Sequence, residues 1–178
     1  MHVTDEIVLC LPRMKDEKEA LAYRAEHFEA GEMTIHGDGG LDEAMDYRLW
    51  VEKLERDRFP DTVTPGLCPA TTFFGRRKSD GRIVGTIQVR YELNEYLFKY
   101  GGHIGYGVRP SERRKGYATR MLRLALDHAR SMKILRVLIT CERSNVASAC
   151  TILRCGGAME NEITGDDGRI FQRYWIEL

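Results

Sequence analysis

Hydrophobic residues recur with two different periods along the 178-residue chain, and each change of period marks a change of secondary structure. Alternation and short β-branched or aromatic runs predict strands, whereas apolar residues at every third or fourth position predict helices. The clearest helical stripe consists of Ala118, Met121, Leu122, Ala125, Ala129 and Met132. The expected strands are residues 6–11, 71–76, 82–91, 103–108, 136–141, 158–163 and 169–178, and the expected helices are residues 16–28, 41–57, a helix that begins near Gly116, and residues 145–154.

The order of these segments is β-α-α-β-β-β-α-β-α-β-β, which predicts a single α/β domain over residues 1–178. Residues 31–40 contain four glycines and predict a mobile loop, and residues 59–69 contain three prolines and predict a second loop. Asp16 is the expected N-cap of the first helix. Residues 93–100 fit either a short helix or a loop. No internal repeat, low-complexity tract or linker interrupts the sequence.

The 27 Lys and Arg residues balance the 27 Asp and Glu residues, which argues against a broad polyanion-binding surface. The balance is uneven along the chain. Residues 1–89 carry 12 basic and 17 acidic side chains, whereas residues 90–178 carry 15 basic and 10 acidic ones. Between Arg109 and Arg136, nine basic side chains stand against only Glu112 and Asp127. The sequence therefore predicts no nucleic-acid partner, but it leaves room for one small anionic ligand.

Other features exclude further classes of protein. No apolar run approaches the roughly 18 residues that a membrane span needs, so no membrane partner is expected. The first eleven residues lack the basic start and apolar core of a secretory signal. The five cysteines are irregularly spaced and form no C-x-x-C pair, which argues against a metal cluster or a disulfide framework. The expectation is a cytoplasmic protein with buried thiols and no metal.

One segment, residues 103–118, concentrates the features of an anion-binding site. A strand ends at Val108, a basic turn follows, and a helix begins near Gly116. The N-terminus of a helix offers about four unpaired N–H groups and the positive end of its dipole, which suits a phosphate or pyrophosphate. The small residues Gly116 and Ala118 let such a group approach the backbone. The spacing matches neither G-x-x-x-x-G-K-[ST] nor G-x-G-x-x-G, so a P-loop and a Rossmann turn are excluded.

The sequence Arg113-Arg114-Lys115-Gly116-Tyr117-Ala118 resembles the Q/R-x-x-G-x-G/A signature of the GCN5-related N-acetyltransferase (GNAT) superfamily, and the preceding Val108-Arg109-Pro110 matches its usual lead-in. The flanking strand and helix, and the order of elements along nearly the whole chain, also resemble that superfamily. The resemblance implies an α/β (α+β) fold with a mixed, mostly antiparallel central sheet of about seven strands flanked by about four helices. It also implies an enzyme, an acetyl-CoA-dependent N-acetyltransferase, and it allows a homodimer.

The same resemblance assigns residues to the cosubstrate acetyl-CoA. Its pyrophosphate is expected on the backbone amides of the basic turn and helix start, and its pantetheine arm along the end of the preceding strand. The implied binding residues are Tyr106, Gly107, Val108, Arg113, Arg114, Lys115, Gly116, Tyr117, Ala118, Thr119, Asn145 and Ser148. Gly105 and Gly107 are compatible either with a β-bulge in that strand or with close packing.

The helix of residues 145–154 departs from the family pattern at one position. At 100° per residue, Asn145, Ser148 and Ile152 share one face, and the expected core face holds Val146, Ala149, Cys150 and Leu153. Many members of the superfamily carry a Tyr seven residues after the Asn, where it acts as general acid toward the departing thiolate. Ile152 occupies that position here and has no proton to give.

The implied reaction is direct attack of an amine on the thioester in a ternary complex, with the oxyanion held by a strand N–H near residues 106–108. A base or a water chain has to deprotonate the ammonium group. The candidate catalytic residues are Tyr106, His103 and Glu92, and Glu142 is a further candidate base. Alternation places His103 and Tyr106 on opposite faces of their strand. The alternative is that both residues have structural roles only, with His103 as a half-buried strand residue and Tyr106 as a packed side chain.

The acceptor is expected beside the first two helices and the loops of residues 31–40 and 59–69. The acidic residues Asp38, Asp42, Glu43 and Asp46 suit a cationic amine, although a solvated acidic face is the commoner explanation. The acceptor class is a primary amine of a small molecule or a peptide. Two alternatives stay open: a noncatalytic acyl-CoA-binding or regulatory module on the same fold, which Ile152 favours, and an unrelated anion-binding α/β domain.

Overall fold

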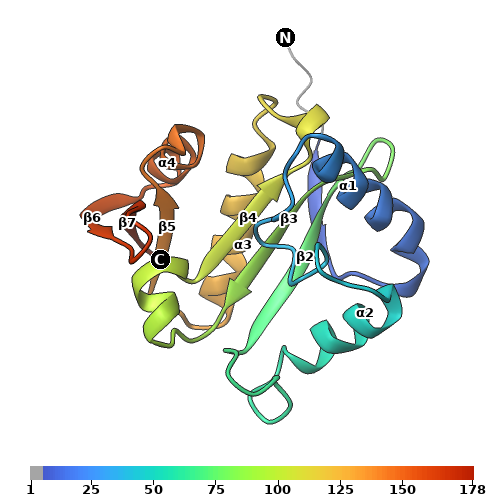
Figure 1. Cartoon of the computed structure of the whole chain (residues 1–178), viewed down its shortest axis with the longest axis horizontal. Helices are drawn as coiled ribbons and strands as arrows, with labels where there is room; N and C mark the ends of the chain where they lie inside the picture. The colour runs from blue at the N-terminus through green and yellow to red at the C-terminus, as the bar shows by residue number, and fades with distance from the viewer. Residues whose placement is uncertain (1–5) are drawn as a thin grey trace.

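The strands form two antiparallel sheets that diverge from each other in the computed structural model, which describes residues 6–178 (Figure 1). The larger sheet has the order β1-β2-β3-β4, and the smaller sheet has the order β5-β7-β6. The strands are β1 (Ile7–Cys10), β2 (Ala70–Arg77), β3 (Ile83–Arg90), β4 (Ile104–Val108), β5 (Arg136–Glu142), β6 (Ala158–Thr164) and β7 (Ile170–Glu177). The α-helices are α1 (Glu17–Glu29), α2 (Tyr47–Arg56), α3 (Tyr117–Ser131) and α4 (Val146–Arg154), and short helical turns lie at Met14–Asp16, Leu97–Gly101 and Pro110–Glu112.

The predicted order of strands and helices is confirmed, and so is the mixed α/β class. One detail of the expected sheet differs. Every strand ladder is antiparallel, and β4 pairs with β3 while β5 pairs with β7, so the expected central sheet is divided in two between β4 and β5. This division opens a wedge between the two strands.

Helices cover both faces of the larger sheet (Figure 1). α3 packs on one face, where Met121, Leu122, Ala125 and Ala129 are fully buried, as the apolar stripe predicts. Met132 of that stripe is exposed because α3 ends at Ser131. α1 and α2 pack on the other face and enclose a second core, with Tyr23, Leu41, Trp50 and Phe74 at its centre.

The second helix begins six residues later than predicted. Residues 41–46 form turns because side chains compete with the helix for backbone N–H groups. The carboxylate of Asp38 accepts hydrogen bonds from the N–H groups of Gly40 (2.8 Å) and Asp42 (2.7 Å). The carboxylate of Asp46 then accepts from the Leu49 N–H (3.0 Å) and is the N-cap of α2.

Two further expectations about the N-terminal half need correction. Asp16 occupies the predicted N-cap position of α1, but its side chain does not cap the helix: the carboxylate accepts a hydrogen bond from the Arg13 N–H (2.9 Å) and pairs with Arg76 (2.9 Å). The loop of residues 31–40 was expected to be mobile, whereas Gly37 lies directly on Gly105 of β4. A side chain on Gly37 would collide with the Gly105 carbonyl, and its φ of 76° also favours glycine. The loop is therefore packed onto β4.

The segment that fits helix or loop in the sequence, residues 93–100, leads into the single π-helical turn Leu97–Gly101. This turn connects β3 to β4 beside the smaller sheet, where Tyr100 contacts Phe171 and Phe98 contacts Trp175. Between residues 6 and 178, no helix combines the length and the apolar character needed to cross a membrane.

Candidate functional site

The wedge between β4 and β5 is closed at one end by His103. The His103 N–H donates to the carbonyl of Leu138 on β5 (2.7 Å), and the Leu138 N–H donates to Nδ1 of the His103 imidazole (2.9 Å). The His103 imidazole thus accepts the Leu138 N–H, which in a continuous sheet would donate to a backbone carbonyl of the neighbouring strand. Beyond this point β4 bonds only to β3 and β5 only to β7 as strand ladders, so the strands separate toward Val108 and Glu142.

The two faces of β4 have different neighbours. Gly105 and Gly107 face the loop that follows α1, where a Cβ on Gly107 would lie 3.0 Å from the His36 carbonyl oxygen. The register between β3 and β4 is regular, and the bulge of this sheet lies at Gly75/Arg76 instead. Close packing, rather than a β-bulge, therefore explains the two glycines of β4.

Tyr106 points to the opposite side of β4 and spans the wedge. Its hydroxyl lies 2.9 Å from the Ser148 Oγ in the first turn of α4. Burial raises the pKa of the Tyr106 hydroxyl well above its usual range. The phenol is therefore protonated at neutral pH, which weighs against Tyr106 as the base, and the raised pKa makes it a weaker acid than an exposed tyrosine. The structure brings together two of the residues singled out in the sequence, one from β4 and one from α4.

The basic turn after β4 leads directly into α3. Arg114 (φ 65°) and Gly116 (φ 80°) both adopt left-handed backbone conformations, and Gly116 is the N-cap residue of α3. No side chain of the described chain caps this helix, and nothing lies within 4 Å of a Cβ built on Gly116. The first N–H groups of α3 therefore face open space, as an anion site requires.

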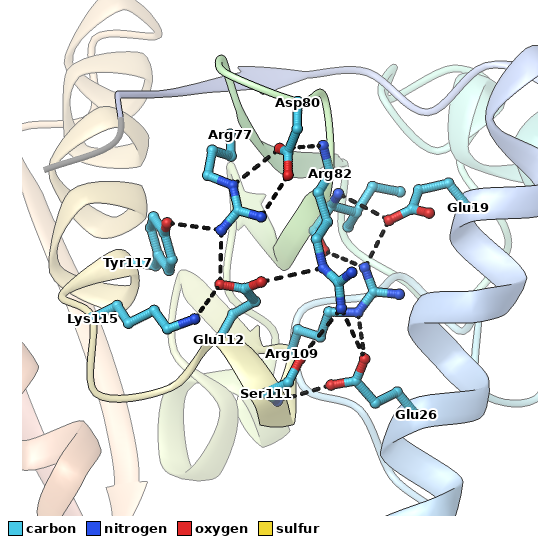
Figure 2. A network of polar contacts seen from close by, with 11 residues as sticks. Glu19, Glu26, Arg77, Asp80, Arg82, Arg109, Ser111, Glu112, Lys115 and Tyr117 are labelled. Atoms are coloured by element: carbon cyan, nitrogen blue, oxygen red, sulfur yellow. Dashed lines mark hydrogen bonds and ion pairs between the residues drawn. The ribbon is translucent and has the colours of Figure 1, made fainter.

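A buried carboxylate lies beneath this turn (Figure 2). Glu112, which is 5% exposed, accepts hydrogen bonds from Arg77 (2.9 Å) and Lys115 (2.9 Å) and pairs with Arg82 (3.2 Å). Burial alone would raise the pKa of Glu112, but the hydrogen bonds from Lys115 and Arg77 outweigh it and lower that pKa. The ammonium group of Lys115 thus bonds Glu112 and stabilises the turn.

A second buried charge joins the same turn to α1 (Figure 2). Arg109 is 3% exposed and donates to Glu19 (2.7 Å) and Glu26 (2.8 Å), and Glu26 also accepts from the Ser111 N–H (2.8 Å). Arg113 forms two hydrogen bonds with Glu32, of 2.7 and 2.6 Å. Of the three basic residues of the turn, Arg113 and Lys115 are paired with carboxylates. Arg114 has no such partner among residues 6–178.

α4 presents a different face to the core from the predicted one. Asn145 is its N-cap and accepts a hydrogen bond from the Ser148 N–H (3.1 Å). Ile152 is fully buried in the main core, whereas Val146, Cys150 and Leu153 of the predicted core face are exposed. The helix is short and mixed in polarity, so tertiary packing decides its orientation rather than its apolar spacing. Ile152 lies one helical turn from Ser148 and is enclosed by the core, and the predicted core face is wrong at Val146, Cys150 and Leu153.

The other two candidate catalytic residues lie apart from Tyr106. Desolvation of the half-buried His103 imidazole lowers its pKa to about 4, so this ring is neutral and its Nδ1 is engaged by Leu138. Glu92 is exposed just beyond β3 and does not line the cleft described below. Glu142, the further candidate base, accepts a hydrogen bond from Arg169 (2.6 Å).

A cleft of about 970 Å³ lies on the face of the larger sheet that α1 and α2 cover. Its walls come from the loop of residues 34–46, from α2, from residues 66–68 and from the turn after β3. The four acidic residues noted in the sequence all line it: Asp38, Asp42, Glu43 and Asp46. Gln88 and Arg90 of β3 also line it, and sequence reasoning missed both. The signal was present, because Thr86, Gln88 and Arg90 are polar residues at every second position of one strand.

The model of the Acetyltransferase (GNAT) family matches residues 41–156, about two-thirds of the chain. The chain belongs to the GNAT acetyltransferase family. The matched region contains β2 to β5, the basic turn and α4, which are the elements that build the wedge and the uncapped helix start. None of the curated protein sequences compared with this acetyltransferase is significantly similar to it.

Solved structures share the fold of this acetyltransferase along nearly its whole length. The microcin C7 self-immunity acetyltransferase MccE, in complex with acetyl-CoA and AMP, superposes with a TM-score of 0.66 at 20% identity and covers 100% of this chain and 96% of its own. RimJ of Mycobacterium smegmatis, in complex with CoA-disulfide, has a TM-score of 0.68 at 20% identity over 96% and 81%. Mutant forms of the spermidine/spermine N-acetyltransferase SpeG of Vibrio cholerae have a TM-score of 0.65 at 12% identity over 96% and 93%.

Proposed function

We propose that this GNAT acetyltransferase transfers the acetyl group of acetyl-CoA to a primary amine of a small molecule or peptide, within a ternary complex. The observation that carries the proposal is the position of β4. One edge of this strand borders the wedge that leads to the uncapped N-terminus of α3, and one face of it lies beside the loop that lines the cleft. A thioester in the wedge and an amine in the cleft would therefore meet at β4.

The residues proposed for acetyl-CoA fall into three groups. The backbone amides of Arg114, Lys115, Gly116, Tyr117 and Ala118, with Thr119, suit the pyrophosphate because the helix start is open and uncapped. The main chain of Tyr106, Gly107 and Val108 suits the pantetheine arm, since the β4 edge toward β5 has no ladder partner. Asn145, Ser148 and the paired Arg113 complete the set. Complexes of two structural relatives with acetyl-CoA and with CoA-disulfide support this cosubstrate.

The chemistry then follows from the placement of these groups. The amine nitrogen forms a bond to the acetyl carbon, and the bond from that carbon to sulfur breaks. A free N–H of β4 near residues 106–108 would stabilise the oxyanion that develops on the acetyl oxygen. We propose that the Tyr106 hydroxyl, held by Ser148, donates a proton to the departing thiolate. His103 and Glu92 stay predictions as bases, and the engaged Nδ1 of His103 weighs against that role.

The acidic side chains of the cleft favour an acceptor that is positively charged at neutral pH, because five carboxyl groups line it. A structural relative, SpeG, is named for spermidine and spermine. A homodimer, a cytoplasmic location and the absence of nucleic-acid, membrane and metal partners stay predictions from the sequence.

The experiment is a thiol-release assay with acetyl-CoA and a panel of amines, with acetyl-CoA binding measured separately. Transfer to at least one amine is expected. Tyr106→Phe should lower kcat about 10²- to 10⁴-fold, the usual contribution of a general acid, with the KM for acetyl-CoA nearly unchanged. Tyr174→Phe, which removes another buried phenol whose hydroxyl bonds Gln172 rather than Ser148, is the matched control.

Binding of acetyl-CoA without transfer to any amine would favour the alternative, a noncatalytic acyl-CoA-binding or regulatory module. An undiminished kcat in the Tyr106→Phe variant would remove Tyr106 from the mechanism while leaving the transfer reaction intact.

A further inference from the structure

Arg90 lies on the floor of the acceptor cleft, at the end of β3. It is half-buried and shares the cleft wall with Gln88, Tyr96 and Leu97. Its guanidinium is close to β4, because a methyl group built on Gly105 would lie 3.6 Å from Arg90 Nη2. The side chain is therefore positioned where the proposed reaction brings amine and thioester together.

The hydrogen bonds of Arg90 use only one end of its guanidinium. Nη1 donates to the carbonyl oxygens of Gly101 (3.3 Å) and Gly102 (3.1 Å). Among residues 6–178, Nε and Nη2 have no hydrogen-bond partner, and neither atom is closed off from the surface. These two nitrogens form the edge with which arginine binds a carboxylate through two parallel hydrogen bonds.

No carboxylate of the described chain neutralises Arg90. Other arginines near the site each pair with at least one: Arg77 with Glu112, Arg109 with Glu19 and Arg113 with Glu32. Burial lowers the pKa of the Arg90 guanidinium, and the Cys68 thiol and the Tyr96 phenol oppose this effect. A half-buried charge without a counterion is unfavourable, so its retention on a cleft floor requires a reason.

The acidic residues of the cleft do not supply the missing counterion. Asp38 and Asp42 accept hydrogen bonds from backbone N–H groups of their own loop, and Asp46 caps α2. Asp57 pairs with Lys53 (2.8 Å). Glu43 is exposed, and within residues 6–178 it forms no ion pair with Arg90. The cleft therefore offers carboxyl groups along the loop that forms one wall and a separate unpaired cation on its floor.

We propose that Arg90 binds a carboxylate of the acceptor, so that the acceptor is an amino acid or another amine that carries a carboxylate close to the reacting nitrogen. This assignment rests on the proposed function, because it specifies the acceptor of that reaction. In an α-amino acid the nitrogen and the carboxylate are attached to the same carbon. An Arg90-bound carboxylate would thus hold the nitrogen beside β4, and the acidic wall would face the positive charge of the free ammonium form.

The test compares methionine, phenylalanine and lysine with their amides and their decarboxylated amines. Acetyl transfer is measured by thiol release, and binding to the protein loaded with coenzyme A is measured by calorimetry. At least one amino acid should be preferred about tenfold or more over its two counterparts that lack the carboxylate, in binding and in kcat/KM. This preference isolates the carboxylate, because the members of each set share the same side chain and the same reacting amino group.

Arg90→Gln should lower kcat/KM for that amino acid about 30- to 100-fold, the loss of a charge-assisted pair, and change kcat/KM for the amide less than threefold. Arg90→Lys keeps the charge without the planar edge and should recover only part of the loss. Arg48→Gln removes a positive charge from the exposed side of α2, outside the cleft lining, and controls for net charge. Thermal unfolding and acetyl-CoA affinity of Arg90→Gln show whether loss of the Gly101 and Gly102 bonds affects the fold.

The outcomes separate this assignment from the proposed function. Preferred binding of the amino acids without transfer to any amine would overturn the proposed reaction and leave the carboxylate site standing. Equal transfer to amino acids and decarboxylated amines, or an Arg90→Gln variant that keeps the preference, would overturn the carboxylate site and leave the reaction standing. Absence of binding by every amino acid of the panel would also overturn it.

Discussion

Asp38 is a carboxyl group held in the cleft wall by the backbone. It is 5% exposed and accepts hydrogen bonds from the N–H groups of Gly40 and Asp42. Burial raises its pKa to about 7, and the neighbouring carboxyl of Asp42 contributes to the rise. The folded chain therefore binds this proton more tightly than the unfolded chain does, so the stabilisation is complete below about pH 4 and is lost as the pH rises through about 7.

The Asp38→Asn variant should remove this pH dependence. In the native protein, one such group lowers the free energy of unfolding by up to about 1.4 kcal/mol per pH unit between its two pKa values. Urea unfolding at pH 5, 6, 7 and 8 should show a flatter profile for Asp38→Asn, and Asp61→Asn, an exposed carboxylate in the loop after α2, should keep the native profile. Identical slopes for Asp38→Asn and the native protein would refute the raised pKa.

At the scale of elements, the His103 residue bonds β4 to β5 at the closed end of the wedge. His103 binds the Leu138 peptide at both its N–H and its carbonyl group, and its ring contacts Trp175 edge-on at 6.4 Å between centroids. The imidazole takes the place of a strand partner at the closed end of the wedge. We therefore expect His103 to position the two strands that the cosubstrate has to enter.

Two variants separate that positioning role from catalysis by a base. His103→Leu leaves the Leu138 N–H without an acceptor, which costs about 1–3 kcal/mol of stability, and should raise the KM for acetyl-CoA about tenfold. His103→Asn places an amide oxygen where Nδ1 accepted and should restore most of both losses. If His103 only positions the strands, the His103→Asn variant should have a pH–kcat profile of the same shape as the native protein. Loss of the acid limb of that profile in both variants would show instead that His103 acts as the base.

The elements differ in how far the sequence predicts them. β4, the basic turn and α3 follow from local signals, because a strand pattern, a left-handed glycine and an apolar stripe occur within one continuous segment. The buried face of α4 does not follow from local signals, since a nine-residue helix of mixed polarity can pack in several orientations. Only contact with the core places Ile152 inside. The sequence does not point to Arg90, because what distinguishes this residue is that no carboxylate pairs with it among residues 6–178. A sequence pattern cannot show which charges are paired in the fold.

At the scale of the whole molecule, the polar network in Figure 2 connects parts of the chain that no local pattern relates. Arg109 bonds Glu19 and Glu26 across 90 and 83 positions of sequence. Through Glu112 and Arg77, the same region joins the end of β2 to the turn before α3. The proposed pyrophosphate site is therefore supported from α1 and from the β2–β3 hairpin together, and its geometry is a property of the assembled fold.

This support can be tested at Glu112. Glu112→Gln leaves Arg77, Arg82 and Lys115 around a neutral amide, and the loss of one partner of a buried ion pair costs about 3 kcal/mol or more. We expect lower stability in urea unfolding and a KM for acetyl-CoA raised about tenfold, with kcat changed less than threefold, because the turn loosens while the β4 wedge stays intact. Asp80→Asn, which weakens an exposed pair with Arg77, should change each quantity far less. A Glu112→Gln variant with native acetyl-CoA affinity would show that the turn keeps its conformation without the buried carboxylate.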